Sequence, residues 1–155
     1  FISSKETDER VAFVSELNKY RTIDCPGDVL NNYKKLKGRG DQKYKSNFLK
    51  KYTFNISFEN TNSDGYVTEK IIQPMFVNTL PIYWGTKEVK KDFNPKSFIY
   101  IDDFTSYGQA IKHIQDIFEN RELYNEILSE PWFHGNEIPT QFRPTSILNF
   151  LENIL

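Results

Sequence analysis

The stretch FNISFENTNSDGYVTEKIIQP, residues 54–74, decides the fold. Its first part alternates phenylalanine and isoleucine with polar residues up to Phe58, which is typical of a β-strand. A polar, glycine-containing loop follows, and an apolar helical pattern then runs from about Thr68 to Val77. Strand, loop and helix in this order predict an α/β domain with a mainly parallel sheet.

The rest of the chain continues this alternation of strands and helices. A strand end is expected at residues 1–3, and further strands are predicted at residues 21–25, 79–84 and 97–101. Helices are predicted after a cap at Thr7 or Asp8, and over residues 46–52, 109–120 and 121–130. Residues 26–45 are expected to form a loop, and residues 141–155 to hold a terminal helix capped by Thr145 or Ser146.

The composition limits the classes of function. The 155 residues suffice for one domain, and the 20 basic and 21 acidic residues leave a formal net charge of -1. Such a balance produces no overall field for nucleic acid or an anionic membrane, so any anion must be bound locally. The single cysteine, Cys25, excludes an internal disulfide, favours a reducing compartment and is expected to be an inert thiol. The start at FISSKE, without methionine, indicates a piece of a longer protein.

The Thr-Glu-Lys sequence at the predicted helix start is the main candidate site. In open α/β sheets, ligands bind where loops lead from strands into helix N-termini. Lys70 has the wrong charge for the positive end of a helix, which makes sense if an anion lies between its ammonium and the backbone amides. Glu69 could accept hydrogen bonds from a ribose diol. A solvated first turn with a self-neutralising Glu69–Lys70 pair is the simpler alternative.

Other candidates for chemistry have plainer explanations. Asp102-Asp103 resembles the acidic pairs that bind metals in some sugar transferases, but a turn that ends the strand is favoured. His113 and His134 have no Cys or carboxylate at ligand spacing, so no metal site is expected. Arg10, just past the first strand, is either a surface arginine or a phosphate ligand.

Two short motifs are discounted. GRGDQK, residues 38–43, lacks the ending of a phosphate-binding loop, and its Arg-Gly-Asp is attributed to chance. The Asn-Ile-Ser sequence at Asn55 fits a glycosylation pattern but falls in a predicted strand.

The strings FNISFEN, GYVTEKII, PIYWG and DFNPKSFIYIDDF occur in an order and spacing that resemble the α-1,3/1,4-fucosyltransferases, glycosyltransferase family 10. The resemblance covers about residues 1–110. It implies a GT-B enzyme with two Rossmann-like domains, of which residues 1–155 would be the C-terminal, GDP-fucose-binding domain. The N-terminal acceptor domain would lie outside this chain.

The resemblance also implies roles for individual residues. Arg10 and Lys70 match the basic residues that meet the donor pyrophosphate, and Glu69 matches the carboxylate on the ribose hydroxyls. Further matches wrap the nucleoside and phosphates (Tyr66, Val67, Thr68), line the fucose and phosphate side (Glu59, Asn60) or are lesser candidates (Ser3).

The implied reaction moves L-fucose from GDP-fucose to the GlcNAc of an N-acetyllactosamine-type glycan with inversion. It needs no cofactor and no metal, and the general base belongs to the N-terminal domain. The expected partners are the donor, a glycan acceptor and that domain, without nucleic acid; membrane association would come from segments outside these residues. The expected location is the bacterial cytoplasm or the inner face of the membrane, with the Golgi lumen as the eukaryotic alternative.

Two alternatives remain: a non-catalytic nucleotide-sugar binding module, and a GT-B transferase for another sugar nucleotide. One departure from the family concerns Pro74, which lies inside the predicted helix and removes the N–H that would bond the Lys70 carbonyl. A bend in that helix is therefore expected.

Overall fold

The computed structural model describes residues 1–36, 42–146 and 148. Its described part contains a parallel sheet of three strands in the order β1-β2-β3. The strands are β1 (Phe54–Phe58), β2 (Leu80–Trp84) and β3 (Ile99–Tyr100). In the register, Ile56 pairs with Ile82, and Ile82 pairs with Ile99. The predicted α/β class with a parallel sheet is confirmed.

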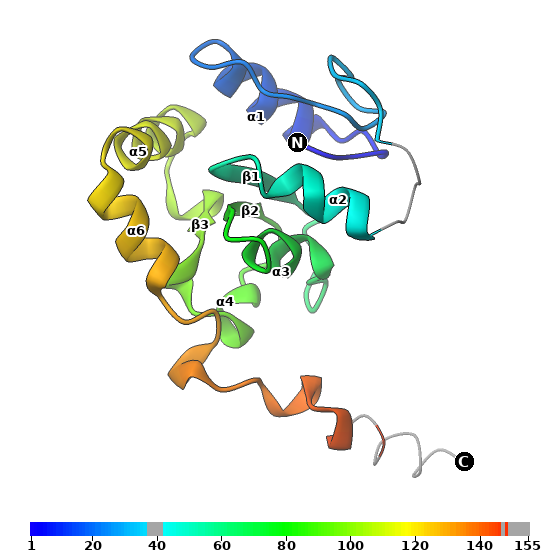
Figure 1. The fold of residues 1–155 in the computed structure, drawn as a ribbon, viewed down its shortest axis with the longest axis vertical. Coiled ribbons are helices and arrows are strands. Elements are labelled where there is room, and N and C mark those ends of the chain that lie inside the picture. The colour runs from blue at the N-terminus through cyan, green and yellow to red at the C-terminus, as the bar shows by residue number, and fades with distance from the viewer. Residues whose placement is uncertain (37–41, 147, 149–155) are drawn as a thin grey trace.

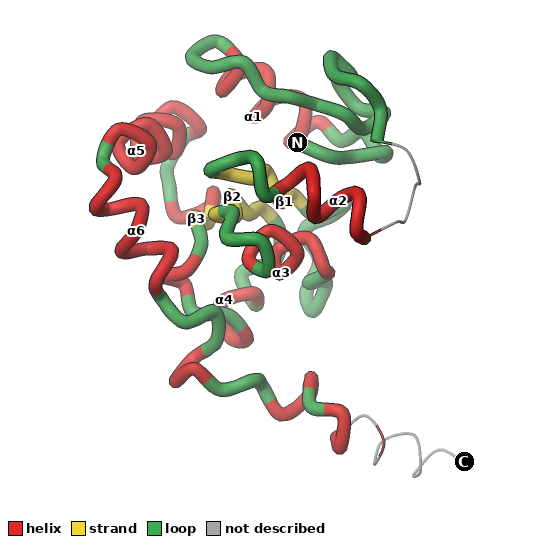
Figure 2. Tube along the Cα trace, viewed as in Figure 1, coloured by secondary structure: helices red, strands yellow, loops and turns green. Residues whose placement is uncertain are grey.

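Helices connect and cover the strands (Figures 1 and 2). They are α1 (Asp8–Asn18), α2 (Gln42–Leu49), α3 (Glu69–Met75), α4 (Val89–Asp92), α5 (Tyr107–Glu119) and α6 (Arg121–Ser129). Short 3-10 turns occur at η1 (Pro95–Ser97), η2 (Ile101–Asp103), η3 (His134–Asn136) and η4 (Thr140–Phe142).

Two apolar cores define three layers. One face of the sheet, with Ile56 and Ile82, packs against apolar side chains of α1 and α5 such as Phe13 and Ile114. On the opposite face, Tyr83 packs in a second cluster with side chains of α3 and α4. Figure 1 shows the strands between these groups of helices. Successive residues of a strand point to opposite faces, so the almost continuously apolar β2 serves both cores.

Side chains at the helix starts explain several helix boundaries. Thr7 caps α1 by accepting a hydrogen bond from the Arg10 N–H, which supports the Thr7 alternative. Ser106 caps α5 in the same way, and Asn120 caps α6. Both caps lie where the sequence predicts helix starts to within a few residues. These ends therefore depend on local chemistry.

Residues 1–3 and 21–25 are not strands, contrary to the prediction. Figure 2 shows the segment after α1 as a continuous loop. Two side-chain amides bond the backbone that a neighbouring strand would otherwise bond. The Cys25 N–H donates to Asn32 Oδ1 at 2.8 Å, and Asn31 Nδ2 donates to the Cys25 carbonyl at 3.0 Å. Asparagine side chains here replace a sheet ladder, which the apolar pattern alone does not reveal.

Two further boundaries differ from the prediction. β3 is shorter than residues 97–101, because Ser97 ends one 3-10 turn and Ile101 starts another. α2 starts at Gln42, inside the predicted loop, and its first turn is tied to α3 by a hydrogen bond of 2.9 Å between the side chains of Gln42 and Gln73. The contact with α3 thus accompanies a helix that begins before the apolar residues Phe48 and Leu49.

After α6, Trp132 and Phe133 still pack against the second apolar cluster, and the later part of the chain extends away from the three-layer body (Figure 1). Residues 144–146 are helical, so Thr145 and Ser146 lie within that turn instead of capping it. Pro144 is the first residue of the turn, a position that proline favours. The rest of the predicted terminal helix lies outside the described residues, apart from Leu148. In the part of the chain that the structure describes, no helix is long and apolar enough to cross a membrane.

Candidate nucleotide-binding site

A cleft of about 560 Å³ opens beside the start of α3. Four parts of the chain converge on it: the N-terminal segment, the turn after Cys25 with residues 35–36, the first turns of α2, and the β1–α3 region. The lining residues that matter below are Ser3, Gly27, Lys45, Asn60, Glu69, Lys70 and Gln73. The cleft therefore brings together Ser3, Asn60, Glu69 and Lys70 of the predicted set.

Lys70 lies at the edge of this cleft with its charge partly neutralised. Its Nζ contacts Glu59 Oε2 and Thr68 Oγ1, each at 2.9 Å. The side chain retains 22% of its exposure. The simpler alternative, a self-neutralising Glu69–Lys70 pair, is not what forms: the ion pair of Lys70 is with Glu59.

Glu59 is fully buried directly after β1. Its carboxylate accepts hydrogen bonds from the Thr68 N–H at 2.8 Å and from the Thr68 hydroxyl, besides its contact with Lys70. Glu59 does not line the cleft. Its carboxylate instead joins the end of β1 to the first turn of α3, and its role toward the donor stays a prediction.

Thr68 occupies the N-cap position of α3, but its hydroxyl makes no capping hydrogen bond to that helix. The hydroxyl bonds Glu59 and Lys70 instead. The Glu59 carboxylate also accepts a hydrogen bond from the Thr68 N–H. The start of α3 is thus held by the strand next to it, through a carboxylate that the sequence places nine residues earlier.

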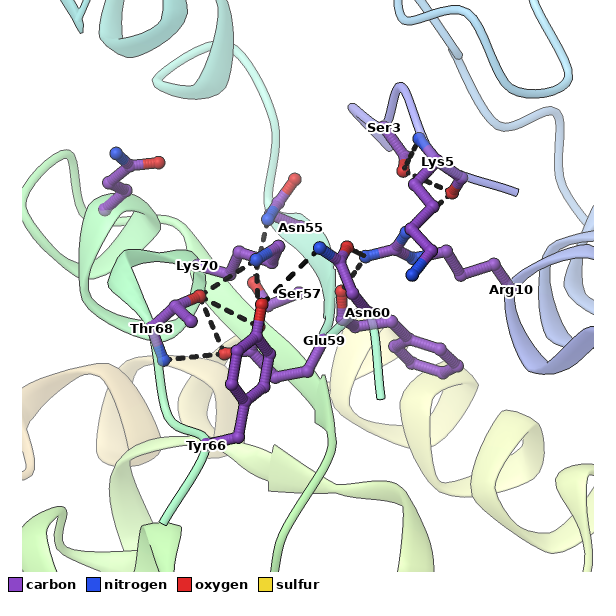
Figure 3. A network of polar contacts seen from close by, with 12 residues as sticks. Ser3, Lys5, Arg10, Asn55, Ser57, Glu59, Asn60, Tyr66, Thr68 and Lys70 are labelled. Atoms are coloured by element: carbon purple, nitrogen blue, oxygen red, sulfur yellow. Dashed lines mark hydrogen bonds and ion pairs between the residues drawn. The ribbon is translucent and has the colours of Figure 1, made fainter. Parts of the chain in front are cut away.

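Arg10 lies on the other side of the same network (Figure 3). It is 1% exposed, and its guanidinium donates to the carbonyls of Lys5 and Phe58 at 2.6 Å and to Asn60 Oδ1 at 2.9 Å. Burial lowers the pKa of the Arg10 guanidinium, while the negative charge of Glu59 opposes that change. Arg10 is therefore not a surface arginine, and it reaches the cleft through Asn60.

Asn60 connects Arg10 to Tyr66. Its Nδ2 lies 3.5 Å from the Tyr66 hydroxyl, and its side chain lines the cleft. The Gly65 N–H donates to Glu88 Oε2 at 2.7 Å, which ties the loop to the segment before α4. Val67 is half-buried against the apolar cluster beneath α3. Of this loop, Asn60 alone has a side chain in the described lining of the cleft.

Pro74 lies in the last turn of α3, which ends at Met75. Its carbonyl accepts the N–H groups of Val77 and Thr79. The proline thus coincides with the end of a seven-residue helix, and Lys70 lies one turn before it, at the opposite end.

Lys45 lines this cleft, although it falls in the loop predicted for residues 26–45. It lies on α2 at a spacing of three, four and seven residues before Phe48, Leu49 and Tyr52. Residues at that spacing lie on one face of a helix. A predicted helix that began a few residues before Ser46 would therefore have placed Lys45 on the same buried face as Phe48 and Leu49.

The remaining candidates do not form a second site. Asp103 pairs with Lys90 at 2.5 Å, and burial raises the pKa of Asp102. Cys25 is buried, which raises the pKa of its thiol and agrees with an inert role. Within the described ranges no three His, Cys, Asp or Glu side chains gather as metal ligands. Asn55 is buried in β1, as expected, and residues 39–41 lie outside the described residues.

Gly27 allows two segments of the cleft wall to touch. A Cβ atom at this position would lie 2.3 Å from the Ser3 carbonyl oxygen and 2.6 Å from the Ser3 nitrogen. The same carbonyl accepts the N–H of Asp28 at 2.8 Å. Both Ser3 atoms are backbone atoms, so the segments can only separate.

We expect Gly27→Ala to lower the free energy of unfolding by about 1–3 kcal/mol, since overpacking forces the backbone apart. Urea denaturation measures this loss. Gly108→Ala is the matched control, because its added Cβ would meet only Ser106 Oγ, at 3.8 Å, and alanine favours a helix. Equal stability of the two variants would contradict the close packing at Gly27.

Comparison with known proteins identifies the family. The sequence model of glycosyltransferase family 10 (fucosyltransferase), C-terminal part, matches residues 1–141, beyond the 1–110 suggested by the motifs. The alpha-(1,3)-fucosyltransferase FucT of Helicobacter pylori is 42% identical over 121 residues, which are 78% of this chain and 24% of that protein. This chain therefore spans about a quarter of that relative.

Solved structures agree with the sequence match. A crystal structure of an alpha1,3-fucosyltransferase with GDP is 40% identical and superposes with a TM-score of 0.77 over 84% of this chain and 37% of that chain. A crystal structure of an alpha1,3-fucosyltransferase with GDP-fucose has a TM-score of 0.85 and 35% identity over 99% of this chain and 46% of that chain. The chain belongs to glycosyltransferase family 10, the fucosyltransferases, and corresponds to the C-terminal part of that family.

Proposed function

We propose that this chain is the donor-binding domain of an inverting α-1,3-fucosyltransferase, which moves L-fucose from GDP-fucose to the GlcNAc of an N-acetyllactosamine-type glycan. The observation that carries the proposal is the cleft at the start of α3, where Glu69 and Lys70 lie side by side. The similar structures with GDP and with GDP-fucose support the choice of donor.

In the proposed complex the diphosphate lies against Lys70 and the ribose against Glu69. The side chain of Glu69 is not tied by a hydrogen bond within the described residues and lines the cleft, so its carboxylate is available to a diol. Glu59 keeps the Lys70 ammonium at the start of α3. The two neighbouring charges thus have separate tasks, one toward phosphate and one toward sugar hydroxyls.

The chemical step breaks the bond between the fucose C1 and the β-phosphate oxygen, and negative charge grows on the leaving GDP. A positioned ammonium stabilises that charge more in the transition state than in the ground state. Lys70 supplies this ammonium, and no metal or cofactor is assigned to the step. Deprotonation of the acceptor hydroxyl is assigned to a carboxylate of the N-terminal domain and to no residue of this chain.

We expect Lys70→Ala to weaken GDP-fucose binding about tenfold to a hundredfold, because one charge-assisted contact of about 1.5–3 kcal/mol is lost. Calorimetric titration of the purified full-length protein measures the affinity. Lys96→Ala is the control, since Lys96 is exposed and lies away from this cleft.

The same titrations with GDP, UDP and ADP separate the proposal from a transferase for another sugar nucleotide. GDP should bind most tightly. Unchanged donor affinity in Lys70→Ala would sink the site assignment, while preference for UDP or ADP would sink the choice of donor.

A further inference from the structure

Lys45 is a second lysine of the cleft, and it comes from a different helix than Lys70. Its side chain is half-buried on α2, and its ammonium donates to Gln73 Oε1 on α3. Gln73 is held in turn by Gln42, whose Oε1 accepts from Gln73 Nε2 at 2.9 Å. The ammonium is thus fixed in place by neutral groups, at the wall of the cleft.

The charges around the two lysines differ. Lys70 has the carboxylate of Glu59 at 2.9 Å. In the described part of the chain, no carboxylate lies within ion-pair distance of Lys45, whose recorded side-chain partner is the amide of Gln73. Partial burial of a cation without a carboxylate in direct contact is costly, and a bound anion in contact with it offsets that cost.

The titration behaviour of Lys45 agrees with this position. Burial lowers the pKa of Lys45, the negative charge of Glu69 raises it, and the positive charge of Lys70 lowers it. The two ammonium groups at the wall of the cleft therefore repel each other. A polyanion between them removes that repulsion, whereas a neutral ligand does not.

We propose that Lys45 is a further donor-binding residue, which contacts an anionic oxygen of the nucleoside diphosphate together with Lys70. This inference rests on the proposed function. It adds a cation from α2 to the one at the start of α3, so that the diphosphate is held between two helices. The carbonyl of the nucleobase is the competing partner for the same ammonium, and the experiment below separates the two.

The test compares GDP with guanosine, because the two differ only in the diphosphate. Titration calorimetry on the full-length protein would use Lys45→Met, which keeps the aliphatic stem without the charge, and Lys45→Arg, which keeps the charge. Lys45→Met should bind GDP at least about tenfold more weakly and guanosine unchanged, and Lys45→Arg should recover part of the loss. Lys50→Met, at an exposed position just after α2, is the control.

A pH series gives a readout that a purely structural role would not change. Lys45 loses its proton as the pH rises through its lowered pKa, at a lower pH than an ordinary lysine, so the GDP affinity of the wild type should fall with rising pH more steeply than that of Lys45→Arg. The titration of the nucleobase cancels in the ratio of the two proteins. Parallel pH profiles would overturn the proposal.

The remaining outcomes are distinct. Equal losses for GDP and guanosine in Lys45→Met would overturn the phosphate contact in favour of the nucleobase or of a structural role. Unchanged GDP binding in Lys45→Met, with a weakened Lys70→Ala, would overturn the Lys45 assignment and leave the proposed function intact. A wild-type protein that binds no GDP would overturn both.

Discussion

Replacing Glu59 with alanine is expected to lower the free energy of unfolding by about 3–5 kcal/mol, because removing one partner of a buried ion pair leaves the other without its counter-charge. Glu59 is fully buried, and its carboxylate accepts from the Thr68 N–H, the Thr68 hydroxyl and Lys70. Lys70 keeps 22% of its exposure, which favours the lower end of this range. Guanidinium chloride denaturation measures the loss.

Glu59→Gln should lose less than Glu59→Ala, since the amide oxygen still accepts the Thr68 N–H. The matched control is Glu126→Ala, an exposed glutamate on α6, where a change within about 0.5 kcal/mol is expected. The donor affinity of Glu59→Gln should also fall, because the ammonium of Lys70 is no longer held at the start of α3. A Glu59→Ala protein as stable as the control would contradict the anchoring role of the carboxylate.

The second large effect concerns Arg10. We expect Arg10→Lys to lower the free energy of unfolding by at least about 3 kcal/mol, since an ammonium cannot reach acceptors on three residues in the geometry of a guanidinium. Arg10 bonds the carbonyls of Lys5 and Phe58 and the side chain of Asn60, and it is 1% exposed. Urea denaturation would follow this loss.

Arg121→Lys is the control for Arg10, because Arg121 is exposed and its described side-chain contact is with the ring of Tyr124. A stability equal to this control would show that Arg10 does not hold the N-terminal segment to β1. Donor affinity, measured where the variant is folded, tests the phosphate contact separately. In this structure the guanidinium meets Asn60 at the cleft wall, so an affinity loss in Arg10→Lys would include the displacement of Asn60.

Local patterns predicted the elements next to the site. The alternation that ends at Phe58 and the apolar run at Leu80 became β1 and β2, and the pattern after Thr68 became α3. These elements follow from period and turn chemistry alone. Residues 21–25 were also predicted as a strand, but Asn31 and Asn32 bond their backbone groups, so a sheet does not form there. The competing partners lie several residues away, beyond the reach of a strand pattern.

The residues of the candidate site likewise fall into two groups, those that local sequence predicts and those that packing brings in. Glu69 and Lys70 were predicted from their place at a helix start, and both line the cleft. The position of Glu59 beneath Lys70 depends on how β1 packs against α3, a contact that the sequence does not contain. Lys45 was missed because the polar first turn of α2 looks like a loop until α3 packs beside it.

The sequence by itself determined the strands and the helix next to the site, the family and the charged pair that begins α3, because each of these depends on residues close together in the chain. Only the tertiary structure decided which charges meet. Lys70 pairs with Glu59 instead of Glu69, Arg10 is buried against Phe58 and Asn60, and Lys45 enters the cleft. The physical reason is that burial and charge pairing are set by packing between distant segments, and the strength of each charge depends on the water that this packing removes.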